Sequence, residues 1–119
     1  MGIVSTALTA LVALEHVYIL VLEMFLWRKP QGMKTFDLTP EFAEASAAMA
    51  ANQGLYNGFL AAGLALSLAP SAHAFVARVF FLCCVVVAGL YGGLTVKPRI
   101  ALVQALPAAL ALLATWLAI

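Results

Sequence analysis

The sequence predicts an all-α, polytopic membrane protein that folds as an antiparallel bundle of four transmembrane helices. Hydrophobic residues make up 66% of the 119 positions and charged residues only 9%, whereas a soluble domain has about 25% charged residues. A soluble chain of this length could not bury so much apolar surface. The chain also contains four apolar segments near the roughly 20 residues that a helix needs to span a bilayer. The lipid bilayer is therefore an expected partner, and the formal net charge of +1 gives no reason to expect nucleic acid.

The expected helices belong to a single membrane domain. They cover about residues 3–27, 40–69, 72–94 and 99–119 of the chain 1–119. The second begins with Thr39 as a cap, Pro40 in the first helical position and Glu41 at the positive end of the helix dipole. Only short breaks separate the last three helices, so consecutive helices must run antiparallel. In the last helix, Pro107 lacks a backbone N–H and is expected to produce a kink.

The distribution of basic residues predicts the topology. The longest connection, about residues 28–39, and the connection before the last helix together contain Arg28, Lys29, Lys34, Lys97 and Arg99. In a four-helix bundle these two connections lie on the same side, and only Arg78 lies near the other side. Because cytoplasmic loops are enriched in Lys and Arg, we predict both connections in the cytoplasm and both chain termini outside it.

Polar residues recur along one face of the first helix. At 100° per residue, Glu23 lies about 20° from His16, and the same sector holds Ser5, Thr9 and Trp27. Glu15 lies about 100° from this stripe and must face a different neighbour. Charged groups at bilayer depth are costly and mark functional sites by default. The stripe is therefore expected to face protein or water.

The second helix offers a polar counterpart, which consists of Asn52, Gln53, Tyr56 and Asn57. Their spacing places them on one face, with Gly54 and Gly58 on the other side of the helix. Counting from the helix starts predicts that this group lies near the midplane, level with Glu15 and His16. The same count places Glu44 level with Glu23.

Simpler interpretations exist for several of these residues. Tyr56 and Asn57 could only hold helices together, since amide side chains often bond across membrane helices. Arg78 either extends to the outer interface or pairs with Glu15. A metal site of His16, Glu23 and Glu44 is disfavoured, because seven residues separate the first two by about 10.5 Å along the helix. The sequence indicates no metal and no cofactor.

The segments "ALEHVYILVLEMFLW", "FDLTPEF", "ANQGLYNGFLAAG" and "GLYGG" together resemble the small bacterial integral-membrane family numbered 1304 among domains of unknown function. The resemblance covers essentially the whole chain. It implies four transmembrane helices in a bacterial inner membrane and implies no activity. The recurring positions of that family correspond here to Glu15, His16, Glu23, Asn52, Gln53, Tyr56, Asn57 and Tyr91.

Three functions remain open from the sequence. The first is a polar ligand site at the midplane, used for transport or permeation of a small solute with proton or cation coupling, since an imidazole titrates near neutral pH. The second is a membrane-embedded enzyme, in which His16 and a glutamate perform acid–base chemistry on a lipophilic substrate. The third is a structural or partner-binding subunit. Because four helices barely enclose a path, we expect a homo-oligomer.

Overall fold

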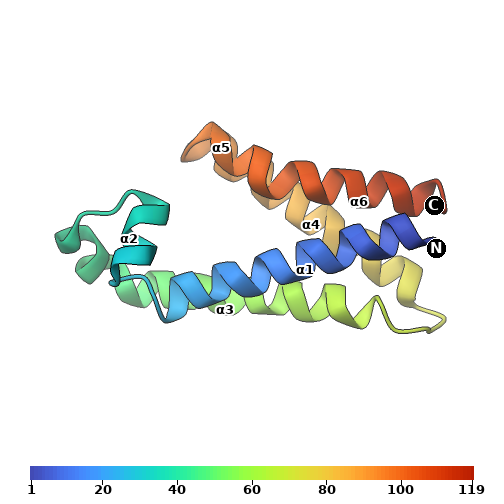
Figure 1. Ribbon diagram of the computed structural model, residues 1–119, viewed down its shortest axis with the longest axis horizontal. Helices are drawn as coiled ribbons and strands as arrows, with labels where there is room; N and C mark the ends of the chain where they lie inside the picture. Colours follow the sequence, from blue (N-terminus) through green and yellow to red (C-terminus); the bar gives the residue numbers. More distant parts are fainter. The chain divides into compact units, whose positions relative to one another are not determined.

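The computed structural model describes residues 1–119, and all its regular structure is helical (Figure 1). In chain order the elements are α1 (Ile3–Met24), α2 (Pro30–Phe36), α3 (Pro40–Leu66), α4 (Ala74–Thr95), α5 (Pro98–Ile100), the π-helical turn η1 (Ala101–Ala105) and α6 (Leu106–Trp116). The all-α prediction is confirmed. The segment that we expected as a loop, about residues 28–39, contains the short helix α2.

Three helical segments are long and apolar enough to cross a membrane. They are Ile3–Met24, Ala74–Thr95 and the continuous stretch Pro98–Trp116. These spans are compatible with a multi-pass membrane protein. The longest helix, α3, is not among them, because its first half is rich in Ala, Ser, Glu and side-chain amides rather than large apolar residues.

The chain forms two compact units. The first, here the terminal unit, consists of residues 1–14 and 60–119, and the second, the central unit, consists of residues 15–59. The core of the terminal unit contains Val12, Leu64, Leu82, Val85 and Ala108, which come from α1, α3, α4 and α6. All five have exposed fractions of 0%.

Close helix approach in the terminal unit depends on glycines of α4. A Cβ atom on Gly89 would lie 2.6 Å from the backbone nitrogen of Ala105, and one on Gly93 would lie 2.6 Å from the Cβ atom of Ala101. The small-residue spacing of "GLYGG" therefore serves a contact within the chain, between α4 and η1.

The turn η1 directly precedes Pro107. The Leu106 N–H donates to the carbonyl oxygen of Ala101, five residues earlier, as in a π-helix. Pro107 has no N–H to donate to its preceding turn and its ring crowds that turn. A π-helical turn therefore lies on the N-terminal side of Pro107, where the sequence predicts a kink.

The central unit contains the end of α1, the start of α3 and α2 between them. Gln31 donates from Nε2 to the Tyr18 hydroxyl at 3.2 Å, which ties α2 to α1. The rings of Trp27 and Phe36 lie 4.9 Å apart. Helix α2 ends at Phe36, and the φ of 55° at its C-cap residue Asp37 reverses the chain toward α3. Residues 25–39 are therefore a packed structure rather than an open loop.

Candidate functional site beside Glu23

The polar stripe on α1 is buried. Ser5 and Thr9 in the terminal unit are 0% exposed, and in the central unit His16 is 1% and Glu23 9% exposed. This burial agrees with the expectation that the stripe faces protein. Trp27 lies beyond the last residue of α1 and reaches the same region from the connection to α2.

Glu23 contacts α3 through Asn57. The Nδ2 atom of Asn57 donates to the Glu23 carboxylate at 2.6 Å and also contacts the carbonyl oxygen of Gln53 at 3.2 Å. This bond fixes the register of the two helices, because it places Asn57 level with Glu23. The expectation that Asn57 is level with Glu15 and His16 at the midplane is wrong. The count assumed that α3 enters the membrane at Pro40, whereas its first turns extend beyond the end of α1.

The glycines of α3, and not most of its polar side chains, face α1. A Cβ atom on Gly54 would lie 2.6 Å from Cγ of Met24, 3.1 Å from Cβ of Glu23 and 3.3 Å from the carbonyl oxygen of Leu20. Gly58 lies against Leu20 in the same way, at 2.7 Å from its Cδ1. The prediction is therefore wrong about which face of α3 packs against α1: the glycine face does, and not the polar face.

Most residues of the predicted polar group lie on the side of α3 that faces away from α1. Asn52, Gln53 and Tyr56 are exposed, and Asn57 alone of the predicted group bonds to α1. The packed face is identified by small residues that recur every three or four positions, at Ala43, Ala47, Ala50, Gly54 and Gly58. Such a seam allows helix backbones to approach closely.

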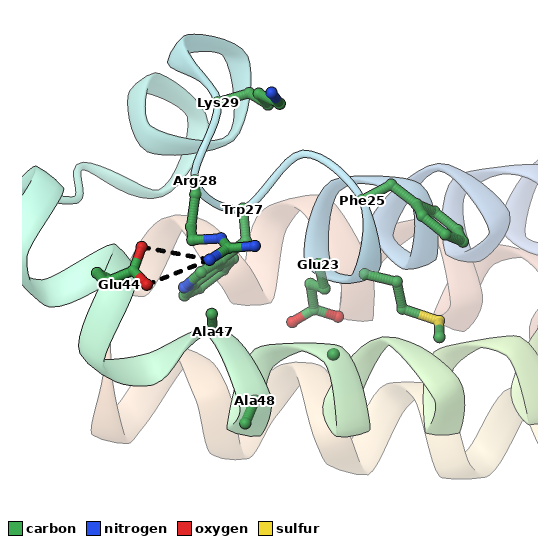
Figure 2. A pocket seen from close by; sticks show the side chains of 10 residues that line it. Glu23, Phe25, Trp27, Arg28, Lys29, Glu44, Ala47 and Ala48 are labelled. Atoms are coloured by element: carbon green, nitrogen blue, oxygen red, sulfur yellow. Dashed lines mark hydrogen bonds and ion pairs between the residues drawn. The ribbon is translucent and has the colours of Figure 1, made fainter.

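A cavity of about 450 Å³ lies beside Glu23. Its wall includes Glu23, Trp27 and Arg28 from the end of α1 and the segment after it, and Glu44, Ala47 and Ala51 from α3. Figure 2 shows the Glu23 carboxylate directed toward α3 and the Arg28 and Glu44 side chains meeting at the other end of the cavity. The short alanine side chains leave the space between the two helices open.

The outer end of the cavity is held by two polar contacts. Nη1 of Arg28 lies 3.2 Å and 3.3 Å from the two carboxylate oxygens of Glu44, and Nε1 of Trp27 donates to the Ser46 hydroxyl at 3.0 Å. The Arg28 and Glu44 side chains are 60% and 71% exposed, so their ion pair adds little stability. Glu44 is thus level with Arg28 and not, as expected, with Glu23.

The inner end of the cavity is bordered by the Glu23 carboxyl group. Glu44 neutralises Arg28, and Lys29 extends beside α2, away from Glu23 (Figure 2). The only hydrogen-bond partner of Glu23 is the neutral amide of Asn57. An anionic oxygen in low-dielectric surroundings attracts a cation or a proton. The arrangement can therefore accept a positively charged group or a proton beside Glu23.

A protein-family model described as "Protein of unknown function (DUF1304)" matches residues 10–116. The chain belongs to this family. It is also 35% identical over 119 residues to the uncharacterized protein YpaA of Lactococcus lactis subsp. lactis (strain IL1403), and the alignment covers 98% of this chain and 99% of the relative. No solved structure matches the chain. The DUF1304 match includes the whole cavity beside Glu23.

The other predicted residues of this DUF1304 chain lie away from the cavity. His16 is buried two turns before Glu23 on α1, and Glu15 is half-buried, with Oε1 enclosed and without a hydrogen-bond partner. Tyr91 is 70% exposed on α4. No three His, Cys, Asp or Glu side chains gather as a metal site.

Arg78 is buried in the terminal unit of the DUF1304 chain. It is 2% exposed, with Nη1 at 3.3 Å from the Ser5 hydroxyl and Nη2 at 3.1 Å from the carbonyl oxygen of Ser67. Ser67 follows the last residue of α3, so the guanidinium satisfies a carbonyl at a helix C-terminus. Arg78 does not extend to the interface, and its pairing with Glu15 stays a prediction.

Proposed function

We propose that this protein is a multi-pass protein of the bacterial plasma membrane that binds a proton or a small cation at Glu23 and allows it to cross the membrane. The observation that supports this proposal is the Glu23 carboxylate itself. It lies in an apolar helix, is 9% exposed, has one neutral partner and borders a cavity.

The energetics favour a ligand over simple helix packing. Burial of a charged carboxylate away from water costs free energy unless it is fully paired, whereas a hydrogen bond between membrane helices contributes about 0.6 kcal/mol on average. The bond to Asn57 offsets only part of such a cost. A bound cation or proton removes the remaining imbalance, and the cavity of about 450 Å³ falls within the size range of small-molecule sites.

We further propose the orientation of the site. The second half of α3 forms the fourth crossing beside the three apolar spans, and the basic residues between α1 and α3 lie in the cytoplasm, in accord with the positive-inside rule. The cavity then opens to the cytoplasm, and both termini lie outside it. His16, two turns deeper on the same stripe, is the next ionisable position along the path.

The alternative of a membrane-embedded enzyme has less support. Acid–base catalysis needs two groups within reach of one substrate atom or its neighbours. His16 and Glu23 are seven residues apart, about 10.5 Å along α1, so they do not form a local acid–base pair. A purely structural role is distinguished from transport by the experiment below.

The test is flux through purified protein in liposomes. With a pH-sensitive dye inside and a potassium diffusion potential across the membrane, the wild type is expected to conduct protons, or to carry sodium, potassium or methylammonium in parallel assays. Glu23→Gln removes the negative charge but keeps the shape, so the flux is expected to fall about tenfold or more. Glu41→Gln is the matched control, because Glu41 is exposed on α3 and does not border the cavity.

Two results would overturn the proposal. One is the absence of any flux in the wild type for all four cations. The other is a Glu23→Gln variant that conducts as well as the wild type. If Glu23→Gln instead changes only the melting temperature, Glu23 serves to hold α1 and α3 together.

A further inference from the structure

The cavity beside Glu23 is larger than an inorganic cation requires. Its volume is about 450 Å³, which corresponds to on the order of fifteen water molecules at about 30 Å³ each. A metal ion in a protein takes about four or more ligand atoms, and no three His, Cys, Asp or Glu side chains gather around this space. A proton or a metal ion would leave most of the cavity to water. The size of the cavity therefore favours a cation that carries bulk of its own.

The wall of the cavity contains almost no free hydrogen-bonding group. Four of its ten residues are charged, and the other six are apolar or aromatic: Met24, Phe25, Trp27, Ala47, Ala48 and Ala51. The one polar atom among those six, Nε1 of Trp27, already donates to Ser46. Both carboxylate oxygens of Glu44 lie within 3.3 Å of Arg28. Only one oxygen of Glu23 accepts a hydrogen bond, so the other is free to face a cation.

Such a wall discriminates between kinds of ammonium ion. A primary ammonium group has three N–H donors, and a donor that leaves water without an acceptor costs free energy. Glu23 alone provides too few acceptors for three donors. A quaternary ammonium ion has no N–H, and its alkyl groups gain free energy when they leave water for an apolar wall. One negative charge in apolar surroundings therefore suits a quaternary ammonium ion best.

The Trp27 ring adds a second attraction for such an ion. A cation over an aromatic face is attracted by the ring electrons, most strongly over Trp. The ring is held by the bond to Ser46 at 3.0 Å and by the Phe36 ring at 4.9 Å, and Phe36 does not line the cavity. A ring that is fixed before binding loses little freedom when a ligand arrives. Figure 2 shows the Trp27 ring and the Glu23 carboxylate both directed toward α3 near Ala47.

We propose that the cation bound at Glu23 is a quaternary ammonium ion. Its positive charge faces the Glu23 carboxylate, and its alkyl groups pack against Trp27 and Ala47. This inference rests on the proposed function and names the ligand class of the same site.

Calorimetric titration of the purified protein in detergent tests the ligand class. The probes are the chlorides of ammonium, methylammonium, tetramethylammonium and tetraethylammonium at constant ionic strength. The two quaternary ions are expected to bind about tenfold or more tightly than the other two. Glu23→Gln in the same detergent is expected to abolish this binding, which separates the site from uptake of alkyl ions by the micelle. Equal affinities along the series, or quaternary-ion binding that survives in Glu23→Gln, would refute the proposal.

Two variants test where the alkyl groups lie. Ala47→Leu fills the cavity and is expected to weaken tetraethylammonium about tenfold but the smaller tetramethylammonium less, a size dependence that unfolding would not produce. Ala45→Leu, exposed on α3 and outside the wall, is the matched control with wild-type affinities. Trp27→Leu is expected to weaken both ions about threefold or more. If Ala47→Leu binds tetraethylammonium as tightly as Ala45→Leu does, the ion does not occupy this cavity.

The liposome assay separates this inference from the proposed function. Glu23-dependent proton flux in a protein that does not prefer quaternary ions would retain the proposed function and refute the ligand class. Preferential binding of quaternary ions in a protein that conducts no cation would support the ligand class and refute transport.

Discussion

At the scale of single residues, small side chains decide which face of α3 meets α1. The sequence suggests that polar residues should face inward, but packing energy between membrane helices depends on close backbone approach. Gly54 allows Met24 and Glu23 of α1 to occupy the space where a Cβ atom would lie. Only Asn57, next to Gly58, is both polar and close to this seam, and it alone bonds to α1.

Substitution of Gly54 by Ala is expected to destabilise the protein by about 1–3 kcal/mol, the usual cost of overpacking. The new Cβ atom would lie 3.1 Å from Cβ of Glu23 and 3.3 Å from the backbone oxygen of Leu20, in addition to Cγ of Met24. Gly58→Ala is the matched control, because its Cβ would meet only the terminal Cδ1 of Leu20, which can rotate away. Thermal unfolding in detergent should show the larger drop for Gly54→Ala, and equal drops would contradict the packing described.

At the scale of elements, the position of α3 along α1 places the site. The bond between Glu23 and Asn57 sets Asn57 level with the end of α1, so the first turns of α3 extend beyond that end. Counting residues from the predicted helix starts could not reveal this shift, because it assumes that a helix and its membrane-embedded part begin together. The site moves accordingly from the midplane to the end of α1 near the basic connection.

The contact between α4 and η1 gives a prediction for a second element. Gly89→Ala is expected to lower the melting temperature by several degrees, since its Cβ would lie 2.6 Å and 3.0 Å from the backbone nitrogen and Cα of Ala105. Backbone atoms in a packed turn cannot move without displacing the helix. Gly92→Ala, whose Cβ meets only the side chain of Ile100, should have the smaller effect. A larger effect at Gly92 would show that η1 does not pack on Gly89.

At the scale of the whole molecule, the basic residues are the basis of the orientation that we propose from the positive-inside rule. Arg28, Lys29 and Lys34 follow α1, and Lys97 and Arg99 precede or begin the last span. The two groups of basic residues lie on the same side of the membrane if the chain crosses the membrane twice between them. The proposed orientation would place the cavity beside Glu23 on the cytoplasmic side.

Thiol labelling of intact cells checks this orientation. In a Cys83→Ser/Cys84→Ser background, Ile3→Cys is expected to react with a membrane-impermeant maleimide, because the proposed orientation places the first residues outside the cytoplasm. Lys34→Cys should react only after the membrane is permeabilised. Labelling of Lys34→Cys in intact cells would reverse the topology and turn the cavity to the outside.

The sequence by itself determined the class of the protein, its all-helical structure, three of its apolar spans and the buried face of α1. These features depend on composition and on the periodicity within one helix, and both properties are contained entirely in residues that are neighbours in the sequence. Only the tertiary structure decided which face of α3 meets α1, that Glu44 pairs with Arg28, and that Glu23 rather than His16 borders a cavity. Those contacts depend on the register between helices, and register is set by the fit of small and large side chains across the interface, which no single segment contains.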